Sequence, residues 1–256
     1  MHIDLNCDMG EGFGAYALGR DEEIVASVSS INIACGFHAG DPHVMARTVR
    51  LARERGVAVG AHPGLPDLIG FGRRDMDCSP EEIADFLTYQ VGALQAFCRA
   101  EGVALRHVKP HGALYNRAAR DERLVRALAG ALARIDRNLL LVGLAGRDNR
   151  RMADIAAAEG IAMVFEAFPD RAYTPEGTLV SRRLSGAVIH DPQAAAARAL
   201  RMVVEQTVAA VDGTVVPLAA GTLCVHGDNP EGVALAAAIR QNLEAAGVAV
   251  RPMQAA

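Results

Sequence analysis

The segment SINIACGFHAGDP, residues 30–42, determines the fold class that this sequence predicts. It begins with a short apolar run over residues 30–35, which is typical of a buried β-strand. It ends at Asp41-Pro42, where an N-cap residue followed by proline indicates the start of a helix. A strand that is apolar on both faces and leads into a helix is typical of a parallel sheet covered by helices. The segment therefore predicts a βα unit, with His38 and Asp41 just past the carboxyl end of its strand.

The same strand-then-helix pattern recurs along the chain and predicts seven parallel strands. We place them at residues 2–6, 30–35, 57–61, 105–109, 139–143, 162–165 and 222–225. The intervening alanine-rich segments have helical spacing, and several have clear start signals. These signals are Asp41-Pro42, the capping box Ser79-Pro80-Glu81-Glu82, Asp191-Pro192 and Asn229-Pro230. No sequence feature marks a domain boundary, so residues 1–256 are predicted to form a single domain.

Polar side chains follow six of the seven predicted strands at their carboxyl ends, where parallel α/β folds place their chemistry. In chain order these are Asn6, Asp8 and Glu11, then His38 and Asp41, His62, Lys109 and His111, Glu166, Asp170 and Arg171, and finally His226 and Asp228. An open sheet would gather its ligands at one switch point, whereas polar groups after nearly every strand indicate that the strand ends converge on one centre. The sequence therefore predicts a seven-stranded parallel β/α barrel, similar to a TIM barrel.

The composition disfavours several classes of protein. The chain has 256 residues, of which 51% are hydrophobic, so it can bury a large core. Its formal net charge is -4 and it has no basic run, so nucleic acid and membrane surfaces are not expected partners. Because the N-terminal segment has no targeting pattern, we expect a cytoplasmic location. Five cysteines without a C-x-x-C pair predict reduced, mostly buried thiols.

Lys109 is the only lysine among the 26 lysine and arginine residues. A surface charge can be either residue, but a lysine is a compact charge with three rotatable donors, and it can lose its proton when it is buried. Its position at the end of a predicted strand, two residues before His111, favours a specific chemical role. A stray surface charge is the alternative.

Several common catalytic motifs are absent from the sequence. A G-x-x-x-x-G-K-[ST] phosphate-binding loop cannot exist, because the only lysine precedes Pro110 and His111. The segment GEGFG, residues 10–14, is not followed by an acidic residue placed to bind the ribose of a dinucleotide. No G-x-S-x-G nucleophile elbow is present either. A nicotinamide-dependent enzyme and a serine hydrolase are therefore disfavoured.

Six segments resemble the successive motifs of the LamB/YcsF family. They are DLNCDMGEGFG (residues 4–14), INIACGFHAGDP (31–42), VGAHPGLPDLIGFGRR (59–74), VKPHGALYN (108–116), EAFPDRAY (166–173) and LCVHGDNP (223–230). The resemblance covers essentially the whole chain. It implies a barrel of the glycoside hydrolase and polysaccharide deacetylase superfamily type. The sequence departs from the family pattern at Leu65, Ser181 and Gly221, which lie beside the motifs and bear on local loop shape.

The resemblance also implies an activity, namely the hydrolysis of the cyclic amide (lactam) 5-oxo-L-proline to L-glutamate, coupled to ATP hydrolysis and carried out with two further subunits. Because this chain lacks a phosphate-binding loop, we expect the partner subunits to hold much of the ATP machinery. The barrel would then hold the lactam or its activated form. Asp8 or Glu11, paired with His38 or His62, would activate and orient the attacking water.

The remaining candidates would stabilise charge or bind the substrate. Lys109 and His111 would stabilise negative charge that develops on the lactam oxygen. Arg171 offers a planar, two-pronged donor set for the substrate carboxylate. The other candidate substrate-binding residues are Asn6, Glu166, Asp170, His226 and Asp228.

Two other interpretations use the same residues. In a metal-dependent, deacetylase-like amide hydrolase, Asp8, His38 and His62 would bind a divalent ion that keeps an open position for water. Against it, the H-x-x-x-H pair usual in those deacetylases is absent, because His38 and His43 are five residues apart. The other interpretation is a catalytically silent scaffold, which has no reason to gather four histidines and a single lysine at one rim. The sequence leaves a divalent metal cofactor open.

Overall fold

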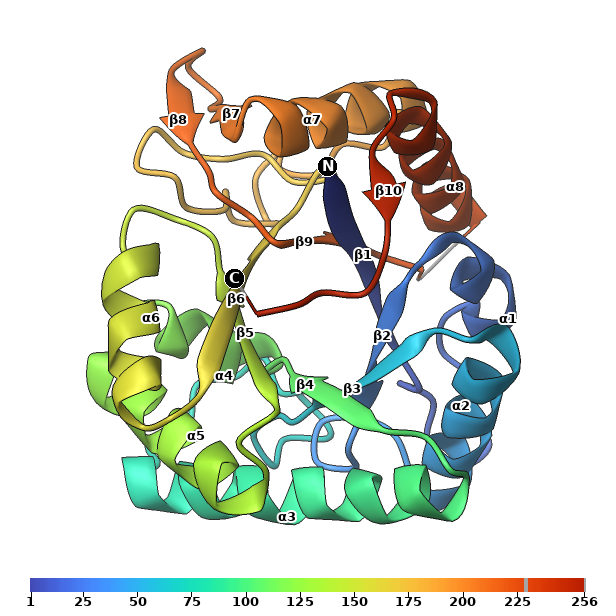
Figure 1. Cartoon of the computed structure of the whole chain (residues 1–256), viewed down its shortest axis with the longest axis vertical. Coiled ribbons are helices and arrows are strands. Elements are labelled where there is room, and N and C mark those ends of the chain that lie inside the picture. Colours follow the sequence, from blue (N-terminus) through green and yellow to red (C-terminus); the bar gives the residue numbers. More distant parts are fainter. Residues whose placement is uncertain (228–229, 256) are drawn as a thin grey trace.

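The computed structural model describes residues 1–227 and 230–255. A ring of strands lies at its centre and helices surround the ring (Figure 1). The strands are β1 (His2–Met9), β2 (Ser30–Ala34), β3 (Ala58–His62), β4 (Leu105–Val108), β5 (Leu140–Leu144), β6 (Ala162–Ala167), β7 (Thr207–Ala209), β8 (Val215–Pro217), β9 (Thr222–Val225) and β10 (Ala249–Val250). The α-helices are α1 (Asp21–Ile24), α2 (Pro42–Arg55), α3 (Pro80–Ala100), α4 (Gly112–Ala118), α5 (Glu122–Ile135), α6 (Asn149–Ala158), α7 (Pro192–Val204) and α8 (Pro230–Ala245).

Seven of these strands form a closed parallel barrel, which confirms the predicted fold class. The barrel strands follow the order β1-β2-β3-β4-β5-β6-β9, and β9 pairs with β1 to close the ring, with Leu223 opposite Leu5. All seven predicted strands are present, and β1 continues to Met9, three residues beyond the predicted end. The sequence pattern missed β10, which pairs with the start of β1, and the antiparallel pair β7 and β8. Segments of two or three residues are too short to show a periodic pattern.

The predicted helix start signals act as caps. The Asp41 carboxylate accepts hydrogen bonds from backbone N–H groups in the first turn of α2, and Asp191 does the same for α7. Ser79 and Glu82 form the predicted capping box at the start of α3. Asn229 lies outside the described residues. Among the described helices, none has the length and apolar content needed to cross a membrane.

Strand β1 alternates between an apolar outer face and a polar inner face. On β1 the outward residues Ile3, Leu5, Cys7 and Met9 belong to the main apolar core beneath the helices. The inward residues of the same strand are Asp4, Asn6 and Asp8, and the first two are completely buried. The expectation that the strands are apolar on both faces is therefore wrong for the inner face of β1. Burial does not require apolar side chains there, because hydrogen bonds across the barrel satisfy the polar groups.

Asp4 is buried inside the barrel near the beginning of β1. Its carboxylate accepts hydrogen bonds from the hydroxyl groups of Ser29, Ser30 and Thr222. Burial raises the pKa of Asp4 to about 6, because the three hydroxyl donors offset only part of the cost of removing the charge from water.

The buried Asp4 carboxyl should make stability depend on pH. Its pKa of about 6 lies above the ordinary 3.8, so the native state binds the proton more tightly than the unfolded chain. The free energy of unfolding should therefore fall as the pH rises from about 4 to about 6, by up to roughly 3 kcal/mol from this group, and then level off. Asp4→Asn cannot titrate. The difference in unfolding free energy between wild type and Asp4→Asn, from urea denaturation at pH 4 to 8, should decline across this window. A difference that does not vary with pH would contradict the prediction.

Candidate active site

A cavity of about 420 Å³ opens at the carboxyl ends of the barrel strands. Its charged and imidazole lining comprises Asp8, Glu11, His62, Arg73, Lys109, His111, Arg171, Arg182, Arg183 and His226. These residues lie at the carboxyl ends of β1, β3, β4, β6 and β9 or in the loops that follow them, so the strand ends do converge on one centre. Seven of the ten were predicted from the sequence, and the three missed are Arg73, Arg182 and Arg183.

The Lys109 side chain lies inside the barrel. Its Nζ atom is 2.9 Å from Asp8 Oδ1 and 2.9 Å from Glu166 Oε1, and only 3% of the residue is exposed. Burial disfavours the charged form, but the two carboxylates outweigh it and raise the pKa of Lys109 well above its ordinary value. Lys109 is therefore a permanent buried cation, neither a stray surface charge nor a base.

The two oxygens of Asp8 have different environments. Oδ1 accepts hydrogen bonds from Lys109 and from Asn32 Nδ2, the latter at 2.8 Å. Oδ2 lies 3.3 Å from His62 Nε2. Burial alone would raise the pKa of Asp8, but His62 and Lys109 hold it well below its usual range. The cavity thus contains an ionised carboxylate with one oxygen held by the lysine and the other directed at an imidazole.

Asn6 and Glu166 lie beneath Lys109 and do not line the cavity. Glu166 Oε1 accepts a hydrogen bond from Asn6 Nδ2 at 2.9 Å, and Glu166 Oε2 accepts one from the Tyr115 hydroxyl at 3.0 Å. Both residues are completely buried. They were predicted to bind substrate, but the structure places them where they hold the lysine. Sequence reasoning did not single out Tyr115 or Asn32, although Asn32 occupies an inward position on β2 next to Asp8.

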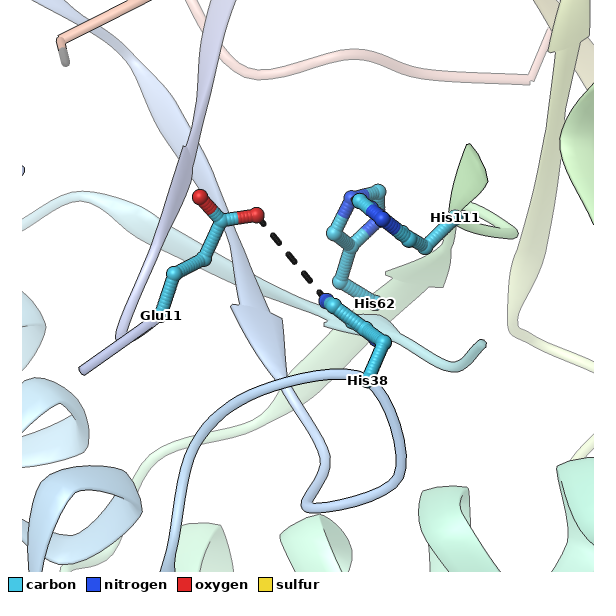
Figure 2. A group of neighbouring side chains, drawn as sticks. All are labelled: Glu11, His38, His62 and His111. Atoms are coloured by element: carbon cyan, nitrogen blue, oxygen red, sulfur yellow. Dashed lines mark hydrogen bonds and ion pairs between the residues drawn. The ribbon is translucent and has the colours of Figure 1, made fainter. Parts of the chain in front are cut away.

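Three buried histidines gather on one side of the cavity. The His38 and His111 rings are stacked, with centroids 3.7 Å apart and planes within 2° of parallel. His111 Nδ1 lies 2.9 Å from His62 Nε2. Burial lowers the pKa of His111 to about 3 and that of His38 well below its ordinary value. Glu11 reaches toward the group, with Oε1 3.9 Å from His38 Nε2 (Figure 2).

A second group extends from the loops after β6 and β9. His226 Nδ1 is 2.6 Å from Asp170 Oδ2, and Arg182 Nη2 is 2.8 Å from His226 Nε2. Because a guanidinium only donates, His226 Nε2 must accept from Arg182 and Nδ1–H must donate to Asp170. Asp170 therefore orients His226 and does not itself line the cavity. Asp228 lies outside the described residues.

The guanidinium of Arg171 is engaged by its own loop. It donates hydrogen bonds to the backbone carbonyls of Val180 and Ala187, at 2.6 and 3.3 Å. Arg73 and Arg182 line the same cavity and are exposed to solvent. These two are better placed to receive an anionic substrate group. Because the chain is rich in arginine, the local sequence does not distinguish Arg73 and Arg182 from the other arginines.

A neighbouring cavity of about 450 Å³ shares Pro110, Tyr115, Asn116 and Leu179 with the first. It lies against β5, and its charged lining is limited to the rim residues Arg120, Arg147, Asp148 and Glu176. The ammonium, the carboxylates and the imidazoles described above face the other cavity. The chemistry of the site is therefore assigned to the cavity above Lys109.

The closed barrel and a cavity of buried ammonium, carboxylate and imidazole groups define a β/α-barrel protein with the components of an acid-base active site. The chain belongs to the LamB/YcsF family, whose model matches residues 3–256. It is 56% identical to the 5-oxoprolinase A subunit of Symbiobacterium thermophilum, over 97% of this chain and 94% of that protein. It is 54% identical to the 5-oxoprolinase A subunit of Heliobacterium modesticaldum, over 98% of both chains. The crystal structure of a lactam utilization protein from Thermus thermophilus superimposes with a TM-score of 0.91 and 52% identity, and the match covers 98% of this chain and 99% of that one.

Removing the buried cation should be strongly destabilising. Lys109→Met keeps most of the side-chain volume but leaves the Asp8 and Glu166 carboxylates without their counter-ion. The free energy of unfolding should fall by roughly 3 to 5 kcal/mol, as measured by denaturant titration. Adding Glu166→Gln removes one uncompensated charge and should restore part of this loss. Arg123→Met, which breaks an exposed ion pair with Asp121, should change stability by less than about 0.5 kcal/mol. Equal effects of the buried and exposed substitutions would refute the assigned role of Lys109.

Proposed function

We propose that this chain opens the lactam ring of 5-oxo-L-proline to give L-glutamate, working within a multi-subunit, ATP-dependent 5-oxoprolinase. The observation that carries the proposal is the similarity of the whole chain, at more than 50% identity, to proteins named as the A subunit of 5-oxoprolinase. The likeness to a lactam utilization protein supports the same class of substrate. The cavity, at about 420 Å³, has room for a five-membered lactam that bears a carboxylate.

The coupling to ATP follows from the stability of the substrate. A five-membered lactam is a poor electrophile, and its hydrolysis is unfavourable near neutral pH, so the amide oxygen requires activation. Phosphoryl transfer from ATP to that oxygen releases ADP. Attack of water on the ring carbon and cleavage of the C–N bond then free the amine and leave an acyl phosphate, which a second water hydrolyses to glutamate and inorganic phosphate. One ATP and two waters are thus consumed for each lactam opened.

The barrel residues supply acid-base chemistry for the steps that use water. Asp8 is ionised and directs Oδ2 toward His62, so this pair would accept the proton of the attacking water. Lys109 keeps Asp8 ionised and would place a positive charge below the reacting oxygen. Burial lowers the pKa of His111 to about 3, so His111 would line this space as a neutral imidazole. Arg73 or Arg182 would bind the substrate carboxylate.

We assign most of the nucleotide machinery to two partner subunits, because the sequence of this chain contains no phosphate-binding loop. The proposed complex works in the cytoplasm without nucleic acid or membrane partners. A metal-dependent amide hydrolase that needs no ATP is the second candidate. It is favoured by the Glu11, His38, His62 and His111 group.

The division of labour can be tested by measuring glutamate and ADP. The isolated chain, mixed with 5-oxo-L-proline, ATP and magnesium, should release neither product in quantity. The complex isolated with its partner subunits should release both in equal amounts. Glutamate formation by the isolated chain without ATP would favour the metal-dependent alternative. ATP-coupled turnover by the isolated chain would overturn the assignment of the nucleotide chemistry to the partners.

The role of Asp8 can be tested with a variant of nearly the same shape. Asp8→Asn in the complex should lower the rate of glutamate formation by about 100-fold or more, because the neutral amide cannot accept a proton. Asp41→Asn is the matched control, since Asp41 also follows a barrel strand but caps α2 outside the cavity, and asparagine caps a helix equally well. The control should keep its activity and its assembly with the partners. Wild-type turnover in Asp8→Asn would remove Asp8 from the proposed mechanism.

A further inference from the structure

The hydrogen bonds around His62 and His111 fix which ring nitrogens carry protons. His62 Nδ1 is 2.7 Å from the Lys109 carbonyl oxygen, and His111 Nε2 is 2.8 Å from the Phe71 carbonyl oxygen. A carbonyl oxygen only accepts, so both of these nitrogens must be N–H donors. The opposite nitrogens, His62 Nε2 and His111 Nδ1, are then bare lone pairs whenever the rings are neutral. They face each other at 2.9 Å.

Two facing lone pairs repel each other unless a cation lies between or beside them. Asp8 Oδ2, another acceptor, lies 3.3 Å from the same His62 nitrogen. Two acceptor atoms, Asp8 Oδ2 and His111 Nδ1, therefore lie close to the bare nitrogen of His62. Either an additional proton or a metal ion must supply the missing positive charge.

The environment of His38 favours one of these two cations, the metal ion, over the other, the additional proton. It is completely buried, and among the described residues neither of its ring nitrogens has a hydrogen-bond partner, although a buried imidazole normally has one. Its ring lies flat against His111, and Nε2 is directed at Glu11 (Figure 2). One proton shared by His62 and His111 would leave His38 unsatisfied. A metal ion accepts lone pairs from several nitrogens at once.

The surroundings of His38 are shaped to hold the imidazole stack. A Cβ atom at Gly64 would lie 2.6 Å from His38 Nδ1. At Gly72 it would lie 2.8 Å from His38 Cβ and 2.9 Å from His111 Cδ2. Gly72 also has a φ of +61°, which glycine adopts without strain. Larger residues at these positions would push the two rings apart, so the local sequence keeps the space that the stack needs.

We propose that Glu11, His38, His62 and His111 bind one divalent transition-metal ion, with an open coordination position that faces the cavity. Their four ligand atoms all lie within 4.8 Å of one another. Two ligands at about 2.1 Å from a common ion are at most about 4.2 Å apart, so the group needs to contract on binding. Glu11 is the ligand able to make this adjustment, because it has the longest side chain of the four and is partly exposed. One of the stacked rings, His38 or His111, also has to rotate, because their in-plane lone pairs lie in parallel planes.

The ligand set selects the class of ion. Three imidazoles and one carboxylate suit zinc, cobalt, nickel or ferrous iron, whereas magnesium and calcium prefer oxygen ligands alone. The carbonyl groups of Lys109 and Phe71 accept from the outer nitrogens of His62 and His111, as is usual for metal-bound histidines. At the open position a carbonyl oxygen or a water would bind. The site shares His62 with the proposed function, and a metal-bound Nε2 of His62 cannot accept a proton, so Asp8 alone would be the base while the ion is bound. Binding to the isolated chain is nevertheless measured without substrate or partners.

The test is direct binding to tag-free protein that has been stripped with chelator and dialysed. Calorimetric titration with Zn²⁺ should give one site per chain. Co²⁺ should produce visible absorption bands of nitrogen and oxygen coordination, again with one equivalent. His38→Ala and His111→Ala should each weaken Zn²⁺ binding by at least about 100-fold. Glu11→Gln, which keeps the shape of the side chain, should weaken it as well and serves if the histidine variants do not fold.

His190→Ala is the matched control, because His190 is an exposed histidine paired with Glu231 outside the cavity. It should bind Zn²⁺ like the wild type. The inference is overturned if the wild type binds neither Zn²⁺ nor Co²⁺ in a stoichiometric way, or if binding survives in both His38→Ala and His111→Ala. It is also overturned if NMR of the metal-free and metal-treated protein shows the same imidazolium N–H shared between His62 and His111. Because no substrate is involved, loss of lactam opening in the complex would not affect these outcomes.

Discussion

The ammonium group of Lys109 inside the barrel is the interaction on which the rest of the site depends. A buried cation is tolerated when carboxylates and hydrogen bonds replace the water it has lost. Asp8 and Glu166 provide that compensation from β1 and β6, the two strands that flank β9. Lys109 comes from the end of β4, across the ring. The ion pairs therefore connect distant parts of the barrel wall and require the barrel to be closed.

The polar interior continues below the lysine as one hydrogen-bonded network. The amide nitrogen of Asn6 donates to Glu166 and to Thr222, while its oxygen accepts from Asn32 Nδ2 at 2.7 Å. Thr222 in turn donates to Asp4. Such a network stabilises one arrangement of the strands when all its members are satisfied, and each unsatisfied member is costly. This constraint explains why the inner face can be polar and buried at the same time.

The unsatisfied polar atoms are not spread evenly through the described structure. They are Nδ1 and Nε2 of His38, Nδ1 of His107 and Oδ1 of Asp170. His38 and Asp170 lie behind residues that line the cavity, in the histidine cluster and in the His226 pair. Groups held without partners cost free energy of folding, and they are retained at sites where a ligand or a reaction uses them. His107 belongs to the network below Lys109, where its Nε2 lies 2.7 Å from Asn32 Oδ1. Three of the four unsatisfied atoms therefore lie around the cavity and one lies in the supporting network.

The sequence by itself determined the features that depend only on residues close together along the chain. Asp41, Ser79 and Asp191 cap their helices because a side-chain oxygen reaches N–H groups two or three residues away, and such contacts can be read locally. The short apolar runs located the seven barrel strands for the same reason. The recurrence of polar residues after these strands was enough to predict closure, and it placed Asp8, His62, Lys109 and His111 at one rim.

Only the tertiary structure decided which of those residues meet and what each of them does. Asn6 and Glu166 are 160 residues apart, and they touch because the register of β1, β9 and β6 brings them together. Other contacts also depend on segments that are distant in the sequence. The Arg171 guanidinium donates to a backbone carbonyl, Arg182 contacts His226, and the His38 ring stacks on that of His111. Strand register and barrel closure are set by packing and hydrogen bonding over the whole ring, and the pattern within any one segment does not contain them.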